Sequence, residues 1–218
     1  ASGSRTENIT RAEASERSHL ISTTSYEVVL DLTSSGPTFA TTTTALFACT
    51  SIGAHTWIDL IAPTVESVTL NGKELPVSEV VQGARILLSD LQEMNTVVVT
   101  AQGKYMNTGE GLHRFIDPVD DQTYLYTQFE SADARRMYAC FEQPDLKATF
   151  TLTATAPAHW KVISNSPMAQ VTEHDNDTKT WEFEPTPIIS TYITALVAGP
   201  YFEVRDEYSG PYGTYPLG

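Results

Sequence analysis

Alternation of apolar and polar residues with a period of two constrains the fold of this chain more than any other feature. In the run 25–33, Tyr26, Val28, Leu30 and Leu32 alternate with residues that include two carboxylates. Successive side chains of a β-strand point to opposite faces, so such a run predicts a strand with one buried face. The pattern recurs in short segments along most of the chain. The sequence therefore predicts an all-β fold.

Turn residues separate the predicted strands. Gly36-Pro37 marks one turn, and Asn71-Gly72 between two apolar runs is the strongest hairpin signal, because both residues tolerate the positive φ of a tight two-residue turn. The expected strands lie at 25–33, 38–48, 56–62, 65–70, 73–77, 84–88, 96–105, 124–129, 147–155, 160–165, 168–172, 179–184, 192–198 and 201–205. Short, evenly spaced strands predict a mainly antiparallel, saddle-shaped β-sandwich of two or more sheets.

Two short helices are expected beside the strands. The polar stretch from about 6 to 18 predicts an N-terminal helix, with Asn8 or Thr10 as its cap. It has no strong apolar stripe, so we expect it to pack only weakly on an edge. A second short helix is expected near 131–139, with Ser131 as a candidate N-cap.

The net charge limits which kinds of partner the chain could bind, and the cysteines indicate its cellular compartment. Thirteen basic against twenty-seven acidic residues give a net charge of −14, which argues against nucleic acid and against an anionic membrane surface. No window approaches the roughly 20 apolar residues of a membrane span, and the polar start does not resemble a secretory signal. Cys49 and Cys140 each lie in an apolar stretch and are expected to be buried free thiols. We therefore expect a cytoplasmic protein.

The candidate metal ligands in the sequence are not spaced as a metal site requires. None of the five histidines has another four residues away, the helical spacing that brings two imidazoles to one zinc. Glu110-x-x-His113 has glycines at 109 and 111 that oppose a helix. The acidic segment 173–178 lacks the glycine and distal glutamate of a calcium loop, so a solvated hairpin tip is expected there. No metal site is predicted in this chain.

The stretch 124–150 carries the densest functional signal. It contains Thr-Gln-Phe-Glu at 127–130, Asp-Ala-Arg-Arg at 133–136 and Cys-Phe-Glu-Gln-Pro-Asp at 140–145. These runs resemble the N-terminal domain of the aminopeptidase N family of zinc metallopeptidases (gluzincins), of the actinobacterial type. Three further stretches agree in order: 107–115, 164–167 and 189–201. The resemblance covers about residues 7 to 218.

The resemblance assigns roles to two residues. It implies that Gln128 lines the pocket for the first side chain of a peptide and that Glu130 helps to hold the free α-amino group. The chemistry suits both, since an amide donates and accepts hydrogen bonds and a carboxylate pairs with an ammonium group. On the residues alone, both are better read as ordinary polar residues at a strand end.

The resemblance also implies what lies outside this chain. The family's His-Glu-x-x-His zinc motif and Gly-x-Met-Glu-Asn motif are absent here, and in the family both follow the region that the chain resembles. We therefore expect residues 6–218 to form a single N-terminal β-domain, cut before the catalytic zinc domain, with a tag remnant or disordered end at 1–5. No catalytic residue or cofactor is expected in the chain itself, and zinc is expected in the full-length enzyme.

Two functions from different classes remain open from the sequence. In the first, the chain is a non-catalytic domain that binds peptide N-termini together with a missing catalytic domain and is inactive alone. The apolar patch where that domain docks would then favour self-association of the fragment. In the alternative, the chain is a stand-alone β-sandwich module that binds carbohydrate or protein on an aromatic platform that includes Trp57, Trp160 and Trp181.

Overall fold

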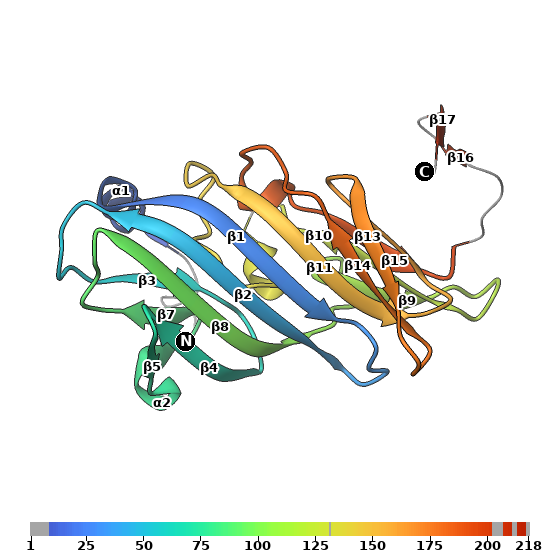
Figure 1. Ribbon diagram of the computed structural model, residues 1–218, viewed down its shortest axis with the longest axis horizontal. Coiled ribbons are helices and arrows are strands. Elements are labelled where there is room, and N and C mark those ends of the chain that lie inside the picture. The colour runs from blue at the N-terminus through green and yellow to red at the C-terminus, as the bar shows by residue number, and fades with distance from the viewer. Residues whose placement is uncertain (1–8, 131, 202–206, 211–212, 217–218) are drawn as a thin grey trace.

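Strands make up most of the computed structural model, which describes residues 9–130, 132–201, 207–210 and 213–216 (Figure 1). The helical elements are α1 (Arg11–Leu20), α2 (Val77–Val80) and two 3-10 turns, η1 (Ala134–Arg136) and η2 (Thr191–Ile193). The strands are β1 (Ile21–Asp31), β2 (Thr38–Cys49), β3 (Thr56–Asp59), β4 (Thr64–Leu70), β5 (Lys73–Leu75), β6 (Val81–Gln82), β7 (Arg85–Leu88), β8 (Met94–Lys104), β9 (Gly111–Ile116), β10 (Thr123–Gln128), β11 (Thr149–Pro157), β12 (Lys161–Ser164), β13 (Met168–Glu173), β14 (Thr178–Phe183), β15 (Leu196–Gly199), β16 (Glu207–Gly210) and β17 (Gly213–Pro216). The predicted all-β class is confirmed.

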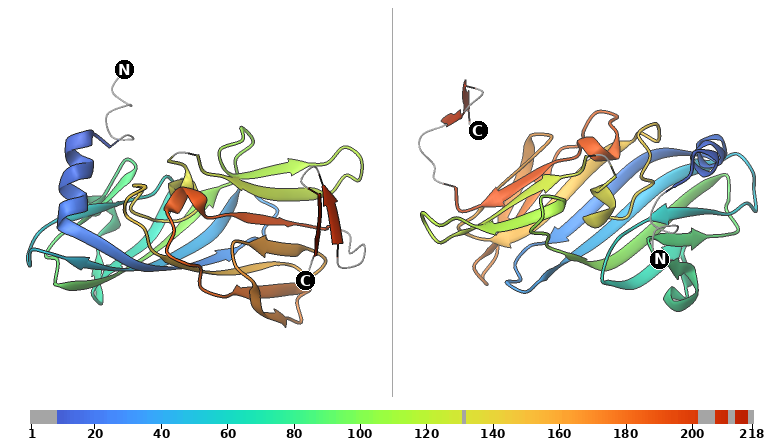
Figure 2. Two further views of the ribbon diagram at one scale, coloured as in Figure 1. Left: turned by 90° about the horizontal axis from the view of Figure 1, so that it is seen from above. Right: turned by 180° about the vertical axis from the view of Figure 1, so that it is seen from behind.

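One large sheet organises the molecule. Its eight strands run in the order β13-β14-β11-β1-β2-β8-β4-β5, and all pairs are antiparallel except β1 with β11. Two smaller sheets, β12-β15-β10-β9 and β3-β7-β6, lie over one face of it (Figure 2). That face is buried along the strands, as the alternation in β1 and β2 shows. Residues of all three sheets share one hydrophobic core, so the fold is the expected sandwich.

The hairpin predicted at Asn71-Gly72 is present between β4 and β5. Asn71 has φ 51° and Gly72 has φ 83°, which is the pair of positive φ values that a tight two-residue turn requires. The register follows from this turn, with Leu70 opposite Lys73 and Val68 opposite Leu75. The turn chemistry therefore fixes which residues of this edge face the core.

Helix α1 packs differently from the expectation. Thr10 caps it as predicted, in a capping box with Glu13, whereas Asn8 lies outside the described residues. The expected weak packing is wrong, because the Arg17 side chain is 0% exposed and its Nη1 lies 2.9 Å from Asp59 Oδ2. The guanidinium carbon also lies 4.5 Å from the centroid of the Trp57 ring. The helix is docked by one buried arginine rather than by an apolar stripe.

The ion pair between Glu13 and Arg85 predicts an acid-dependent loss of stability. The hydrogen bond from Arg85 lowers the pKa of Glu13 from 4.5 to about 2. A lowered folded-state pKa stabilises the fold above pH 4.5, and this stabilisation disappears as the pH falls towards about 2. The side chain of Glu13 is 34% exposed, so solvent screens the pair and we expect about 1 kcal/mol.

Urea denaturation at several pH values measures this effect. Glu13→Gln should lower the free energy of unfolding at pH 7 by about 1 kcal/mol relative to the parent chain, and the difference should vanish near pH 2. Glu16→Gln, an exposed carboxylate of the same helix, serves as the control and should show no such trend. A pH-independent difference for Glu13→Gln would contradict the assignment.

Two local expectations around residues 106–139 need revision. The sequence predicts no strand between 105 and 124, but this segment contains strand β9, whose six residues pair with β10 from Gly111–Gln128 to Ile116–Thr123. The short helix expected near 131–139 is the three-residue 3-10 turn η1. Its central residue, Arg135, donates its N–H to Glu142 and its C=O accepts from Ile61, so tertiary bonds replace those of a longer helix. The proposed cap, Ser131, lies outside the described residues.

Candidate functional site

The end of β10 presents two polar side chains on either side of a buried one. Gln128 is the last residue of the strand and Glu130 lies in the turn that follows, and both are exposed. Phe129 between them is 3% exposed and belongs to the hydrophobic core. The structure therefore places both predicted site residues at one strand end, held by a buried aromatic anchor.

Neighbouring strands hold this end of β10 firmly. Gln128 lies opposite Gly111 of β9, and on the other side the Leu196 N–H of β15 donates to Thr127 Oγ1 at 2.9 Å. The rings of Phe129 and Tyr138 meet edge to face, with centroids 6.5 Å apart. Polar groups at the end of a strand that is fixed on both sides are positioned more precisely than groups on a free loop.

Gly111 is required at its place opposite Gln128. Its φ is +67°, in the left-handed region that favours glycine, and an added Cβ would lie 2.9 Å from Arg136 Cβ. The Arg136 side chain is held there by ion pairs with Asp133 at 3.0 Å and Glu110 at 3.6 Å. The close approach of β9 and η1 therefore depends on this glycine.

An open cavity of about 310 Å³ lies beside η1. Its lining comprises Ile61, Ala62, Pro63, Lys104, Met106 and Arg136. Two of the lining side chains are cationic, and neither Gln128 nor Glu130 contributes to it. Within the described part of the chain, the two predicted site residues are thus displayed on a surface and are not enclosed by this cavity.

Aromatic residues cover the exposed face of the four-stranded sheet next to Gln128. The rings of His113 and Tyr126, opposite one another on β9 and β10, have centroids 4.6 Å apart, and those of Phe115 and Tyr124 are stacked at 5.6 Å. The same face continues across β15 and β12 through Val197 and Ile163, since Tyr126 pairs with Val197 and Val197 with Ile163. We call these six residues the outer face; Phe115 is 39% and Ile163 44% exposed.

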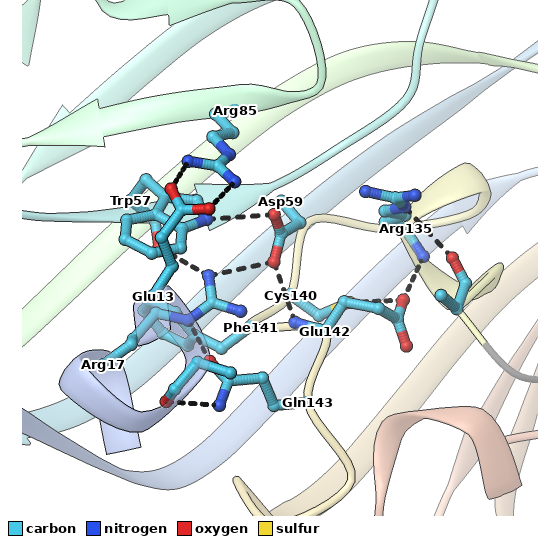
Figure 3. A network of polar contacts seen from close by, with 12 residues as sticks. Glu13, Arg17, Trp57, Asp59, Arg85, Arg135, Cys140, Phe141, Glu142 and Gln143 are labelled. Atoms are coloured by element: carbon cyan, nitrogen blue, oxygen red, sulfur yellow. Dashed lines mark hydrogen bonds and ion pairs between the residues drawn. The ribbon is translucent and has the colours of Figure 1, made fainter. Parts of the chain in front are cut away.

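A buried polar network lies behind the site (Figure 3). The Glu142 carboxylate accepts from the Arg135 N–H at 2.8 Å and from the Thr191 hydroxyl at 2.7 Å. The Glu142 N–H donates to Asp59 Oδ2 at 3.0 Å, and Asp59 pairs with Arg17 of α1. Burial raises the pKa of the Glu142 carboxyl, while the hydrogen bonds from Thr191 and Arg135 oppose that rise.

Sequence reasoning missed this network. Asp59 and Glu142 are 83 positions apart, so no local pattern joins them. One sequence feature could have indicated it. Single carboxylates lie within apolar runs, in Trp-Ile-Asp-Leu at 57–60 and in Cys-Phe-Glu at 140–142. A carboxylate in such a run is buried only with partners.

The other candidate ligands have ordinary structural roles. His113 Nδ1 accepts from the Gly109 N–H at 3.0 Å, and Glu110 pairs with Arg136. A search of the described residues finds no group of three or more His, Cys, Asp or Glu side chains placed to hold a metal ion. Cys49 and Cys140 are buried free thiols, and burial raises the pKa of the Cys140 thiol. No helix in the described part of the chain has both the length and the apolar character needed to cross a membrane.

The three tryptophans do not form the platform of the alternative reading. Trp57 lies against two guanidinium groups, those of Arg17 and Arg85, each 4.5 Å from its ring centroid. Trp160 is 9% exposed, and Trp181 packs against the core. These positions do not support a carbohydrate-binding site formed by the tryptophans.

Comparison with known proteins gives one consistent result. The model of the family described as Peptidase M1 N-terminal domain matches residues 22–193. Aminopeptidase N of Streptomyces lividans is 53% identical over 214 residues, which cover 97% of this chain and 24% of that protein. Aminopeptidase N of Acetobacter pasteurianus is 39% identical over 53% of this chain and 34% of its own length. Leucyl aminopeptidase of Saccharolobus solfataricus is 31% identical over 69% of this chain and 19% of its own. The chain thus spans about a third or less of these relatives.

Proposed function

The chain belongs to the M1 peptidase family, whose N-terminal domain it contains, and on that premise we propose that it anchors the N-terminus of a peptide substrate within a larger zinc aminopeptidase. The observation that carries the proposal is the exposed pair Gln128 and Glu130 at the fixed end of β10. The relatives named above are aminopeptidases that are much longer than this chain.

Each residue of the pair has a distinct role in this proposal. The Glu130 carboxylate pairs with the free α-ammonium group of the peptide, which selects for an unblocked N-terminus. The Gln128 amide contacts the first side chain and so contributes to the choice of residue removed. The burial of Phe129 keeps both groups at a constant spacing, which favours binding in one orientation.

The bond-breaking chemistry would come from outside this chain. We place zinc and its ligands in the rest of the longer protein. The described residues offer no three-ligand metal site. The contribution of this domain is positioning of the substrate. The chain alone is then expected to be inactive.

We assign the outer face to contact with the catalytic part of that protein. It is continuous with Gln128 on β10. Phe115 and Ile163 on it are exposed, whereas Tyr124 is 7% exposed and its ring contacts that of Tyr201. A domain that shares a substrate with Gln128 and Glu130 must lie beside this end of β10. Burial of this face would bring the catalytic residues to the peptide.

Self-association of the isolated chain tests whether the outer face is a docking surface. We expect the chain to form dimers or larger species at high concentration, and Phe115→Ser with Ile163→Ser to return it to a monomer in sedimentation velocity. Val29→Ser, at a 47% exposed position on the open side of the large sheet, is the matched control and should leave the association unchanged. A monomeric parent chain at high concentration would count against this face as the docking surface.

A chimera tests the proposed function. The matching 214 residues of the Streptomyces lividans relative would be replaced by this chain, and hydrolysis of alanine and leucine amides compared with that of the chain alone plus zinc. The chimera should turn over both substrates and the chain alone neither. Gln128→Ala in the chimera should change the leucine-to-alanine ratio of kcat/KM by about 10-fold, the scale of side-chain discrimination in a pocket.

The chimera experiment has a matched control and two outcomes that would contradict the proposal. Glu74→Gln, at an exposed position of the far edge strand β5, should leave the ratio unchanged. An unchanged ratio for Gln128→Ala would remove Gln128 from the substrate pocket. Zinc-dependent turnover by the chain alone would overturn the assignment of a non-catalytic role.

A further inference from the structure

The substrate-facing end of β10 is flanked by two 3-10 turns. Turn η1 follows it after the short connection that carries Glu130, and turn η2 precedes β15, the neighbour of β10 in the sheet. Each turn is short and has few hydrogen bonds of its own. The position of the β10 end therefore depends on what holds these turns.

One buried carboxylate bonds to both turns. Glu142 Oε2 accepts from the backbone N–H of Arg135 in η1, and Glu142 Oε1 accepts from the hydroxyl of Thr191 at the start of η2. Glu142 is 7% exposed and Thr191 is 1% exposed, so water does not readily replace the bond between them. From η2 the chain runs directly into β15, whose Leu196 N–H donates to Thr127 next to Gln128.

Glu142 is itself fixed from behind. Its backbone N–H donates to Asp59, and Asp59 and Cys140 exchange backbone hydrogen bonds at 2.8 and 3.0 Å. On the far side, the carbonyl of Arg135 accepts from the Ile61 N–H at 2.8 Å. The carboxylate is thus a fixed point to which the two turns are tied, rather than a mobile side chain.

We propose that Glu142 is a positioning residue for substrate binding, which fixes Gln128 and Glu130 by joining the two turns on either side of the β10 end. It does not touch the substrate. This inference rests on the proposed function of Gln128 and Glu130 and adds a third residue to that site.

The side-chain chemistry predicts how two substitutions differ. Glu142→Ala removes the acceptors of the Arg135 N–H and of the Thr191 hydroxyl, and the latter is lost in a buried place. Glu142→Gln keeps both contacts, because the amide oxygen accepts from Arg135 and the amide nitrogen donates to the Thr191 oxygen. The glutamine variant is therefore the conservative rescue.

A double-mutant cycle in the chimera tests the inference. Glu142→Ala should lower kcat/KM for alanine amide by about 10- to 100-fold, mainly through a raised KM, because a displacement of about 1 Å at a binding group has effects of this size. In the Glu130→Ala background the same change should cost less than about 3-fold, since only Gln128 of the two positioned groups then remains. Glu142→Gln should stay within about 3-fold of the parent.

A matched buried residue separates positioning from stability. Asn95 is 2% exposed and makes hydrogen bonds to Asn71 and Gln92, none of which lies near β10 in the sheets. Asn95→Ala should destabilise the protein and lower the amount of active enzyme, but leave KM unchanged in both backgrounds. If Glu142→Ala prevents folding, Thr191→Val, which deletes one hydroxyl, takes its place in the cycle.

The outcomes distinguish this inference from the proposed function. Equal losses of kcat/KM in the two backgrounds, or an unchanged KM, would show that Glu142 acts on stability alone and would overturn the inference. A Glu130→Ala variant with unchanged kinetics would overturn the proposed function and the inference with it. A loss confined to the background that retains Glu130, with rescue by glutamine, establishes Glu142 as a positioning residue.

Discussion

Replacing Glu130 with glutamine in the chimera should lower kcat/KM for free-amino substrates by about 30- to 4000-fold. The α-ammonium group would lose its opposite charge in a site that the substrate itself desolvates. Truncating one partner of a buried, hydrogen-bonded charge pair costs about 2–5 kcal/mol, and each 1.4 kcal/mol is about a factor of ten. Glutamine keeps the shape of the side chain, so the loss reports the charge.

The design of the experiment isolates the contact with the amino group. A competitive inhibitor that lacks an α-amino group should bind the Glu130→Gln and parent chimeras equally well, because it makes no contact with the carboxylate. Glu74→Gln removes an exposed carboxylate from the far edge of the large sheet and should have no effect on either measurement. Equal losses for both carboxylates would point to the overall negative charge instead of a specific contact.

The sequence predicted the strands well because their signal is local. Period-two alternation and turn residues act over a few positions, and the hairpin at Asn71-Gly72 depends on the φ preferences of those two residues alone. The same reasoning placed Gln128 at the end of a strand, because Leu125 and Phe129 alternate with it.

The parts that the sequence did not predict depend on distant contacts. Strand β9 was missed because Gly109 and Gly111 resemble loop residues, whereas Gly111 is needed for the close approach of Arg136. The extent of η1 is set by bonds from Glu142 and Ile61, which no local pattern contains. Tertiary contacts override helix propensity in such short segments.

The packing of α1 also depends on a distant contact, and we expect this contact to contribute more to the free energy of unfolding. An arginine in a polar helix is usually solvent-exposed, so the sequence of α1 indicates a weakly attached element. In the fold, Arg17 enters the core between two other segments, pairs with Asp59 and contacts the Trp57 ring (Figure 3). The same carboxylate accepts from the Glu142 N–H, so the helix is connected to the support of the candidate site.

Arg17→Met should therefore lower the free energy of unfolding by about 3–5 kcal/mol, the cost of breaking a buried ion pair from one side. The Asp59 side chain is 5% exposed and would lose the cation it pairs with, although the hydrogen bonds from Glu142 and Trp57 remain. Adding Asp59→Asn should recover part of the loss, because the uncompensated charge is then removed. Urea denaturation of the isolated chain measures both, with Arg11→Met on the exposed side of α1 as the control. A loss for Arg17→Met no larger than that for Arg11→Met would mean that α1 is held by other contacts, and that the network ends at Asp59.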